Sequence, residues 1–167
     1  MGDSVRFSQS HGIVPIAHSV TGDYNAGFTG ESVNMAKYNH YTLIIIGDNA
    51  VAGNGVLTMN AGATDGATTA AAGFAYRYSA GNIAAASGDV LGVPTVVAAA
   101  GTLTITGASL VSRMLVIELD AADLNIAGVQ YQWVTPVLSA AGTAGYVTMV
   151  AILSEPRYEE AVMDTAI

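Results

Sequence analysis

The sequence contains no cysteine, few charged residues and few aromatic residues. Without cysteine, the 167-residue chain has no disulfide framework, no thiolate metal site and no cysteine nucleophile. Charged residues make up 11% of it, against about 25% in an average protein. Thirteen acidic residues outweigh five basic ones, which gives a formal net charge of −8. This balance offers phosphate groups no basic surface, so it argues against binding to nucleic acid.

Long hydrophobic runs are also absent. The apolar runs at Leu43–Ile46 and Val96–Ala100 are far shorter than the ~20 residues of a membrane-spanning helix, and the start of the chain lacks the basic and apolar stretches of an export signal. A small outer-membrane barrel would suit the alternation and the tyrosines, but the missing signal and the non-alternating run at Leu43–Ile46 disfavour it. We therefore expect no membrane contact and assembly in a reducing cytoplasm. A surface so poor in charge must be covered by small polar residues or by other subunits, which predicts an assembled state.

The most informative stretch is Ser32–Gly47, together with the segment that follows it as far as Tyr78. Its first half alternates apolar and polar residues. By contrast, Thr42–Ile46 is apolar and β-branched without alternation, which predicts a central strand covered on both faces. Glycine and asparagine at Gly47–Asn49 and Gly53–Gly55 accept the backbone angles of tight turns. The sequence therefore predicts a β-meander here.

Further strands are predicted at Gly12–Ala17, Leu57–Ala61, Phe74–Tyr78, Thr102–Thr106, Arg113–Leu119, Val129–Val134 and Tyr146–Leu153. Pro15 makes the first of these an edge strand or an arm. Pro136 should end the ladder of the strand at Val129–Val134 or place that strand at an edge. Asp120 should cap a helical turn that ends near Gly128. Eight or so strands with glycine-rich connections predict an all-β fold, an antiparallel β-sandwich that is jelly-roll-like and carries extended terminal arms. We expect one domain, with an N-terminal arm and edge strand at 1–31, the sandwich at 32–153 and a C-terminal tail at 154–167.

Candidate sites for chemistry are few. Asp48–Gly55 and Asn60–Gly66 offer oxygen ligands for calcium, but they lack the EF-hand pattern, and turn formation explains the same residues. His11, His18 and His40 match no zinc spacing, and a structural role is favoured for the third of them. The Gly-x-Ser-x-Gly motif of serine hydrolases is missing. We therefore expect no catalytic residue, no metal and no cofactor.

Two clusters keep alternative interpretations open. Glu118, Asp120 and Asp123 form the densest acidic group, and paired carboxylates can cleave glycosidic bonds, although helix capping also explains the two aspartates. The aromatic residues of Phe74–Tyr78 share one face of a strand. They could stack on sugar rings, but packing against the second sheet is the favoured interpretation.

A family resemblance rests on the order of several short motifs. Ser-Val-x-Met-x-x-Tyr at Ser32–Tyr38 precedes the apolar strand, and Ala-Thr-Asp-Gly at Ala63–Gly66 and Phe-x-Tyr-Arg at Phe74–Arg77 follow it. This order resembles a family of small virion proteins of tailed bacteriophages, and Ala151–Tyr158 is similar to the closing motif of that family. The resemblance covers residues 30–160. It implies a head-associated component, typically an outer-surface cement or decoration protein.

The hypothesis that follows is a structural, non-enzymatic virion protein on the capsid exterior, assembled in the host cytoplasm. It would self-associate, with a homotrimer as the first expectation, and cement adjacent major capsid proteins by binding the assembled shell. The alternative is a host-glycan-binding module of a tail or fibre. Edge-strand residues, scarce arginines and the closing motif supply the interface candidates, which are Pro15, Ile16, Arg77, Arg157 and Tyr158.

Overall fold

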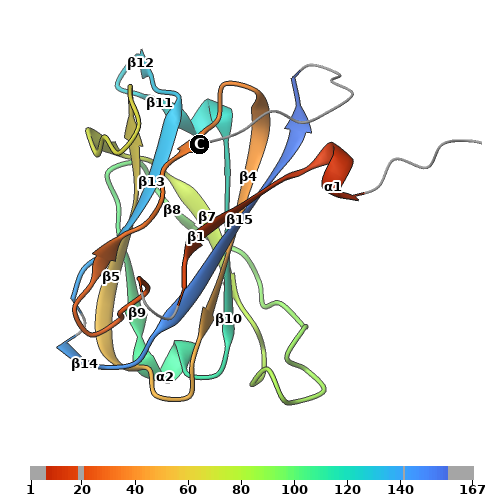
Figure 1. Cartoon of the computed structure of the whole chain (residues 1–167), viewed down its shortest axis with the longest axis vertical. Coiled ribbons are helices and arrows are strands. Elements are labelled where there is room, and N and C mark those ends of the chain that lie inside the picture. The colour runs from red at the N-terminus through yellow and green to blue at the C-terminus, as the bar shows by residue number, and fades with distance from the viewer. Residues whose placement is uncertain (1–6, 19–20, 141, 158–167) are drawn as a thin grey trace, which may run out of the picture.

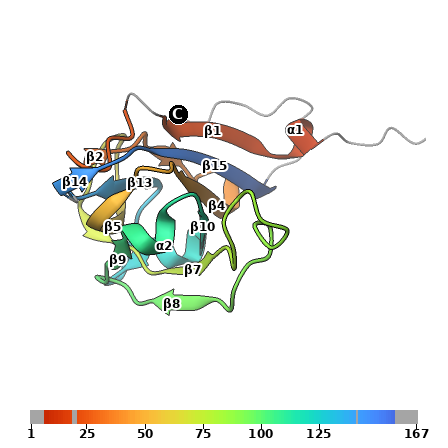
Figure 2. The same ribbon diagram turned by 90° about the horizontal axis from the view of Figure 1, so that it is seen from below.

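The protein is a sandwich of two antiparallel β-sheets packed face to face (Figure 1). The computed structural model describes residues 7–18, 21–140 and 142–157. One sheet has six strands in the order β1-β15-β4-β10-β7-β8. The other is built on the order β14-β5-β13-β2, with β3 beside β13 and with β6 and β9 beside β5. Figure 2 shows the two layers end-on, with β1 and β8 at opposite edges of the first sheet. The predicted all-β antiparallel sandwich is confirmed.

The predicted strands at Gly12–Ala17 and Phe74–Tyr78 have the observed bounds. The predicted β-meander was wrong, because the strand at Ala52–Gly62 includes the expected turn at Gly53–Gly55 and belongs to the other sheet from the strand at Tyr38–Gly47. The six-stranded sheet consists of β1 (Gly12–Ala17), β15 (Val147–Pro156), β4 (Tyr38–Gly47), β10 (Met114–Asp120), β7 (Phe74–Tyr78) and β8 (Thr95–Val97). The second sheet consists of β14 (Gly142–Ala144), β5 (Ala52–Gly62), β13 (Trp133–Leu138), β2 (Phe28–Thr29), β3 (Val33–Asn34), β6 (Ala70–Ala71) and β9 (Leu103–Thr106). A separate hairpin joins β11 (Asn125–Ile126) to β12 (Val129–Gln130).

The helical segments are short. They are α1 (Phe7–Ser10), α2 (Gly107–Leu110) and the 3₁₀ helix η1 (Ala121–Leu124). None of the helices in the described ranges is long and apolar enough to cross a membrane.

The long strands alternate between the two sheets along the chain. β4, β7, β10 and β15 belong to the six-stranded sheet, whereas β5, β9 and β13, which lie between them in sequence, belong to the other. Crossing from sheet to sheet in this way is typical of jelly-roll-like sandwiches. It places β4 in the middle of its sheet, between β15 and β10, which come from the second half of the chain.

The core lies between the sheets and is built from every second residue of the long strands. Leu43 and Ile45 on β4 and Ile117 on β10 are completely buried, and so are Leu57 and Met59 on β5. Full burial of such a side chain stabilises the fold by roughly 1.5–3 kcal/mol. The sandwich therefore gains most of its stability from this interior.

The apolar run on β4 is buried on one face only. Tyr41, Leu43 and Ile45 are buried, but Ile46 points outward and is 40% exposed. The expectation that this strand is covered on both faces was wrong. Isoleucine favours the pleated backbone of a strand whichever face it occupies, so the run is uninterrupted although one of its faces borders solvent.

Pro136 lies within β13, in the middle of a sheet, so the prediction that it ends a ladder or marks an edge was wrong. Its carbonyl oxygen accepts a hydrogen bond from the Gly30 backbone N–H at 2.8 Å. In a strand, the nitrogen and the carbonyl of one residue face the same side. The nitrogen of Pro136 therefore faces the gap between the short ladders that β13 forms with β3 and with β2, where a missing N–H breaks no ladder bond.

Both ends of the described chain belong to the sandwich. β1 is an edge strand, as Pro15 predicted, and pairs with β15 through a register shift between Pro15 and Ala17. β2 joins the other sheet, so the segment 1–31 contributes strands to both layers. β15 runs to Pro156, past the expected boundary at 153. Residues 1–6 of the expected N-terminal arm and 158–167 of the expected C-terminal tail lie outside the described residues.

Candidate functional site on the outer face of the six-stranded sheet

The outer face of the six-stranded sheet carries an apolar band. Residues directly opposite each other on paired strands share a face. Ile44 lies opposite Val150 on one side and Val116 on the other. The other apolar outward residues of β1, β15, β4 and β10 extend this row, and the outward Thr42 and Thr148 lie among them. The band consists of Ile13, Pro15, Ile44, Ile46, Met114, Val116, Val150 and Ile152.

The apolar band is accessible at its two ends and crowded in its middle. Ile13 on β1 is 52% exposed and Ile46 on β4 is 40% exposed. Val116 is only 7% exposed, yet it does not belong to the core between the sheets, because its neighbours on the outer face cover it. No residue of the band is charged, although Arg77 on β7 lies opposite Val116 and Glu118 lies two residues from it, so charged groups border the band on this side. Contiguous apolar surface on a soluble protein marks a site of contact with another molecule.

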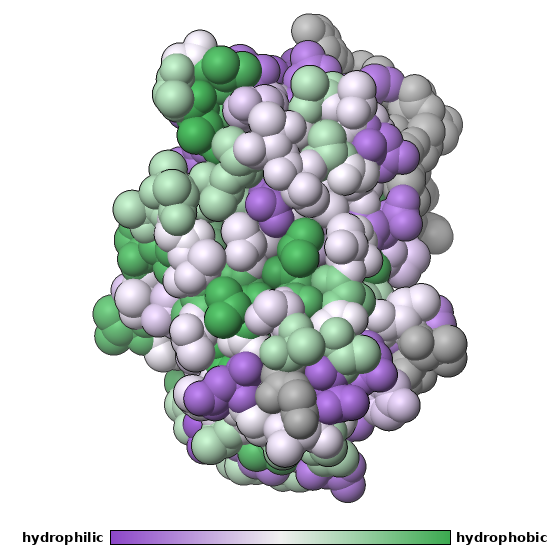
Figure 3. Space-filling model, turned by 90° about the vertical axis from the view of Figure 1, so that its left-hand side faces the viewer, coloured by the Kyte–Doolittle hydropathy of each residue, from purple (hydrophilic) through white to green (hydrophobic). Residues whose placement is uncertain are grey.

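The opposite face of the sandwich has a different composition. On the second sheet, outward threonines alternate with outward valines, since Val137 lies between Thr29 and Thr58 and Val56 lies opposite Thr104. Figure 3 shows this side, where apolar residues gather across the middle and hydrophilic residues lie below them. The register therefore gives this sheet a face on which valines and threonines alternate, whereas apolar residues outnumber the outward threonines in the band of the six-stranded sheet.

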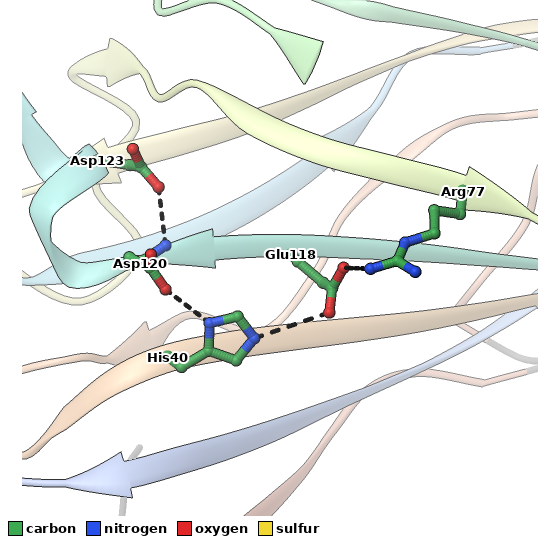
Figure 4. Close-up of polar contacts among 5 residues, drawn as sticks. All are labelled: His40, Arg77, Glu118, Asp120 and Asp123. Carbon is green, nitrogen blue, oxygen red and sulfur yellow. Dashed lines mark hydrogen bonds and ion pairs between the residues drawn. The ribbon is translucent and has the colours of Figure 1, made fainter. Parts of the chain in front are cut away.

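A polar network adjoins the apolar band where β4 begins and β10 ends (Figure 4). The register of these two strands places Asp120 opposite His40. His40 Nδ1 is hydrogen-bonded to Asp120 Oδ1 at 2.6 Å, and its Nε2 lies 3.9 Å from Glu118 Oε1. On the far side, Arg77 Nη2 donates to Glu118 Oε2 at 2.9 Å. His40 is hydrogen-bonded as predicted, and its structural role stays a prediction.

The two aspartates of the network also hold η1 in place. Asp120 and Asp123 form a capping box, in which the Asp120 side chain accepts from a backbone N–H and Asp123 Oδ2 accepts from the Asp120 backbone N–H at 2.8 Å. The predicted capping role of Asp120 is therefore confirmed, although the turn ends at Leu124 and not near Gly128. The carboxylates have partners within the fold, and this arrangement assigns no reaction to them.

A cleft of about 480 Å³ separates the network from β8. Its lining includes two small residues, Gly73 and Ala75, and the exposed Val96. Three carboxylates face it against one guanidinium, so this wall is negative. Within the described ranges, no group of three or more histidine or acidic side chains is placed to hold a metal ion. Asp48, an oxygen donor that the sequence offered for calcium, accepts backbone N–H groups of Ala50 and Tyr146 instead.

The aromatic residues of β7 face the interior. Phe74 is 3% exposed, and Tyr76 and Tyr78 pack against the core with their rings edge to face, 5.9 Å apart. Burial, reinforced by the neighbouring hydroxyls of Tyr76 and Tyr24, raises the pKa of Tyr78 to about 12. The interpretation as core packing is confirmed, and these rings offer no open platform for stacking on a sugar.

The predicted interface residues lie in different environments. Pro15 is exposed within the apolar band. Ile16 is 5% exposed and packs in the core of its own chain, so it offers no surface to a neighbour and its selection is corrected. Arg77 has its carboxylate partner, Glu118, in its own chain. Tyr158 lies outside the described residues.

Arg157 is exposed just beyond β15, and its described partners are an amide and a carbonyl. Its Nε donates to Asn39 Oδ1 at 3.0 Å and its backbone N–H donates to the Lys37 carbonyl at 2.9 Å. The expected carboxylate partner is not found among the described residues. Because exposed pairs contribute little, we expect Arg157→Ala to lower the free energy of unfolding by about 0–1 kcal/mol, against about 1–3 kcal/mol for Arg77→Ala. Urea denaturation of the two variants checks this order, and an equal or larger loss for Arg157→Ala would contradict it.

The apolar band is the feature that the sequence interpretation missed, because Ile44 and Ile46 were assigned to a strand buried on both faces. A signal was available on the strand that pairs with β4. Glu118 lies two residues from Val116 and therefore shares its face. A carboxylate on that face indicates a border with solvent, and the adjacent face of β4 must border it too.

Comparisons with known proteins give little. No protein-family model matches the chain, and no curated protein sequence matches it. The crystal structure of the SPBc2 prophage-derived protein YomS aligns with a TM-score of 0.45 and 14% identity, over 86% of this chain and 91% of that one. The infectious bursal disease virus VP2 subviral particle aligns with a TM-score of 0.20 and 11% identity, over 88% of this chain and 42% of that one. At these scores neither likeness bears on function.

Proposed function

We propose that this chain is a structural, non-enzymatic protein of a tailed-bacteriophage virion. It self-associates, with a homotrimer as the first expectation, and binds the outer surface of the capsid, where it cements adjacent major capsid proteins. It is assembled in the host cytoplasm and needs no cofactor, nucleic acid or membrane. The motifs at Ser32–Tyr38, Ala63–Gly66, Phe74–Arg77 and Ala151–Tyr158 support the assignment by their resemblance to phage head proteins.

The observation that carries the proposal is the apolar band. Ile13 is 52% exposed and Ile46 is 40% exposed on the outer face of the six-stranded sheet, and no residue of the band is charged. Leaving such a surface in water is unfavourable, and covering it with protein stabilises the assembly by roughly 25 cal/mol per Å² of apolar area. Every copy of a decoration protein needs apolar surface for contacts, because each copy must contact both its neighbours and the shell.

The charge of the chain supports the same role. With a net charge of −8 and five basic residues, the protein is repelled by packaged nucleic acid and is suited to the outside of a shell. A ligand that binds only the assembled shell stabilises it by about 2.7 kcal/mol per site when its concentration is 100 times Kd.

The test is co-sedimentation of the purified protein with empty, expanded capsids of the encoding phage that lack it. We expect saturable binding in a fixed ratio to the major capsid protein, and a rise in the melting temperature of the particles. Unassembled capsid protein is the matched control and should bind weakly, because the site spans adjacent subunits. No saturable binding, or binding without any gain in particle stability, would refute the proposed function.

A further inference from the structure

The two edges of the six-stranded sheet differ in how well they are protected. At one edge, Pro15 removes a backbone donor from β1 and the register shift between Pro15 and Ala17 distorts the strand. At the other edge, β8 pairs only with β7, and no further strand lies beyond it in the described chain. Its outward N–H and C=O groups are therefore a template for another strand. Pro94 limits this open stretch on one side, so it comprises Thr95–Val97.

The side chains around β8 are apolar and uncharged. Val93 is 86% exposed, Val96 is 77% exposed and Val90 is 52% exposed, and these are among the most exposed large hydrophobic residues of the described chain. Asp89 is the sole charged residue in the whole stretch between Arg77 and Arg113. Natural sheet edges are commonly guarded by lysine or another charge, and β8 has no such guard.

We propose that β8 pairs in antiparallel fashion with β8 of a second copy of this chain, about a two-fold axis near Val96. An antiparallel pair of identical strands matches every outward donor with an acceptor, and the same patch serves both copies. The pairing joins two six-stranded sheets and brings the exposed valines of the two copies together. The inference deepens the proposed function, because it rests on the proposal that the chain self-associates.

Charge favours a second copy as the occupant. Each copy carries −8, so two copies repel each other least where the contact is uncharged, and the stretch around β8 meets this condition. Glu118, Asp120 and Asp123 line the cleft that Val96 also lines, but they belong to β10 and η1, and β10 lies two strands away from β8 in the sheet. Two strand spacings amount to about 10 Å, which is about one Debye length at 0.1 M salt. A partner with a strong charge of either sign would gain nothing from the uncharged edge itself.

The pairing is distinct from contacts through the apolar band, since one uses an edge of the sheet and the other a face. A three-fold contact through the band and a two-fold contact through β8 can coexist in one assembly. On a capsid, the two-fold contact would link neighbouring oligomers. Links between copies already held on a shell are favoured by their high effective concentration.

Cross-linking tests the geometry directly, because the protein has no cysteine of its own. Residues directly opposite each other in an antiparallel pair have Cα atoms about 4.5–5.5 Å apart, within the range that a disulfide spans. We therefore expect Val96→Cys to form a disulfide-linked dimer under mild oxidation, at least about tenfold faster than Val129→Cys. Val129 is the matched control, because it is 51% exposed on β12, away from the proposed axis.

Sedimentation velocity from low to high micromolar concentration measures the association itself. We expect Val96→Lys to raise the Kd of the two-fold step at least about tenfold, since it places two ammonium groups at the axis. Val129→Lys adds the same charge on β12, away from both proposed contact surfaces, and should not change this step. Equal cross-linking of the two cysteine variants, or no effect of Val96→Lys, would overturn the pairing. If the wild-type protein is a monomer and Val96→Lys abolishes its binding to capsids, the pairing of two copies is overturned, and β8 pairs with a strand of the shell protein instead. Capsid binding by the wild-type protein tests the proposed function separately, and its outcome does not depend on whether β8 pairs with a second copy.

Discussion

Replacing Ile46 by lysine is expected to leave the fold intact and to weaken self-association about 100-fold, because burying an unpaired ammonium group in a contact costs about 3 kcal/mol or more. Ile46 is suited to this test because it is 40% exposed and lies outside the core cluster, opposite Met114 and Thr148. Its side chain points away from the second sheet, so the lysine remains solvated in the monomer. The penalty therefore arises only when another protein covers the apolar band.

Sedimentation velocity measures the oligomer, and urea denaturation verifies that the monomer is still stable. Val129→Lys adds the same charge at a valine that is 51% exposed in the β11–β12 hairpin, and it should leave the oligomer unchanged. Binding of the Ile46→Lys protein to empty capsids should fall as well if the apolar band contacts the shell. An oligomer that persists unchanged in Ile46→Lys would mean that copies meet through another surface.

Local patterns in the sequence predicted several elements of the fold. Phe74–Tyr78 is a strand with the predicted ends, and Asp120 caps a helical turn as expected. Pro15 marks an edge strand, and the apolar segment before Pro156 is central. Each of these conclusions depends on residues close together in the chain, where backbone preference and the alternation of side chains decide the structure.

Features that depend on pairing between distant segments could not be predicted. The contact of His40 with Asp120 requires the register of β4 against β10. The two residues are 80 positions apart in the sequence, and local patterns do not specify this register. Pro136 is tolerated within a sheet only because the ladders of β2 and β3 leave a gap beside it. For Ile46, an outward isoleucine and a buried one have the same strand preference. Local sequence patterns thus predicted several of the strands, whereas long-range pairing decided which faces of the strands border solvent.

Tyr24 is a buried residue whose hydroxyl joins distant parts of the chain. Its side chain is completely buried, and its hydroxyl donates to the Ile105 carbonyl at 2.7 Å. The same hydroxyl accepts from the Gly55 backbone N–H at 3.1 Å. Gly55 and Ile105 face each other on β5 and β9. One phenol therefore satisfies two backbone groups and attaches the segment before β2 to the second sheet.

Tyr24→Phe keeps the ring but removes the hydroxyl. A buried donor and a buried acceptor then each lose their partner, and each loss costs about 1–3 kcal/mol. We therefore expect the free energy of unfolding to fall by about 2–4 kcal/mol. Such a loss is a large part of the total free energy of unfolding, which is usually about 5–15 kcal/mol for a domain. Urea denaturation measures the loss, and Tyr146→Phe, at a tyrosine that is 45% exposed, is the matched control with no expected change. Self-association should persist in the folded fraction, because Tyr24 contributes to neither the apolar band nor β8. A loss of less than about 1 kcal/mol would show that water replaces the hydroxyl, which the complete burial of this side chain argues against.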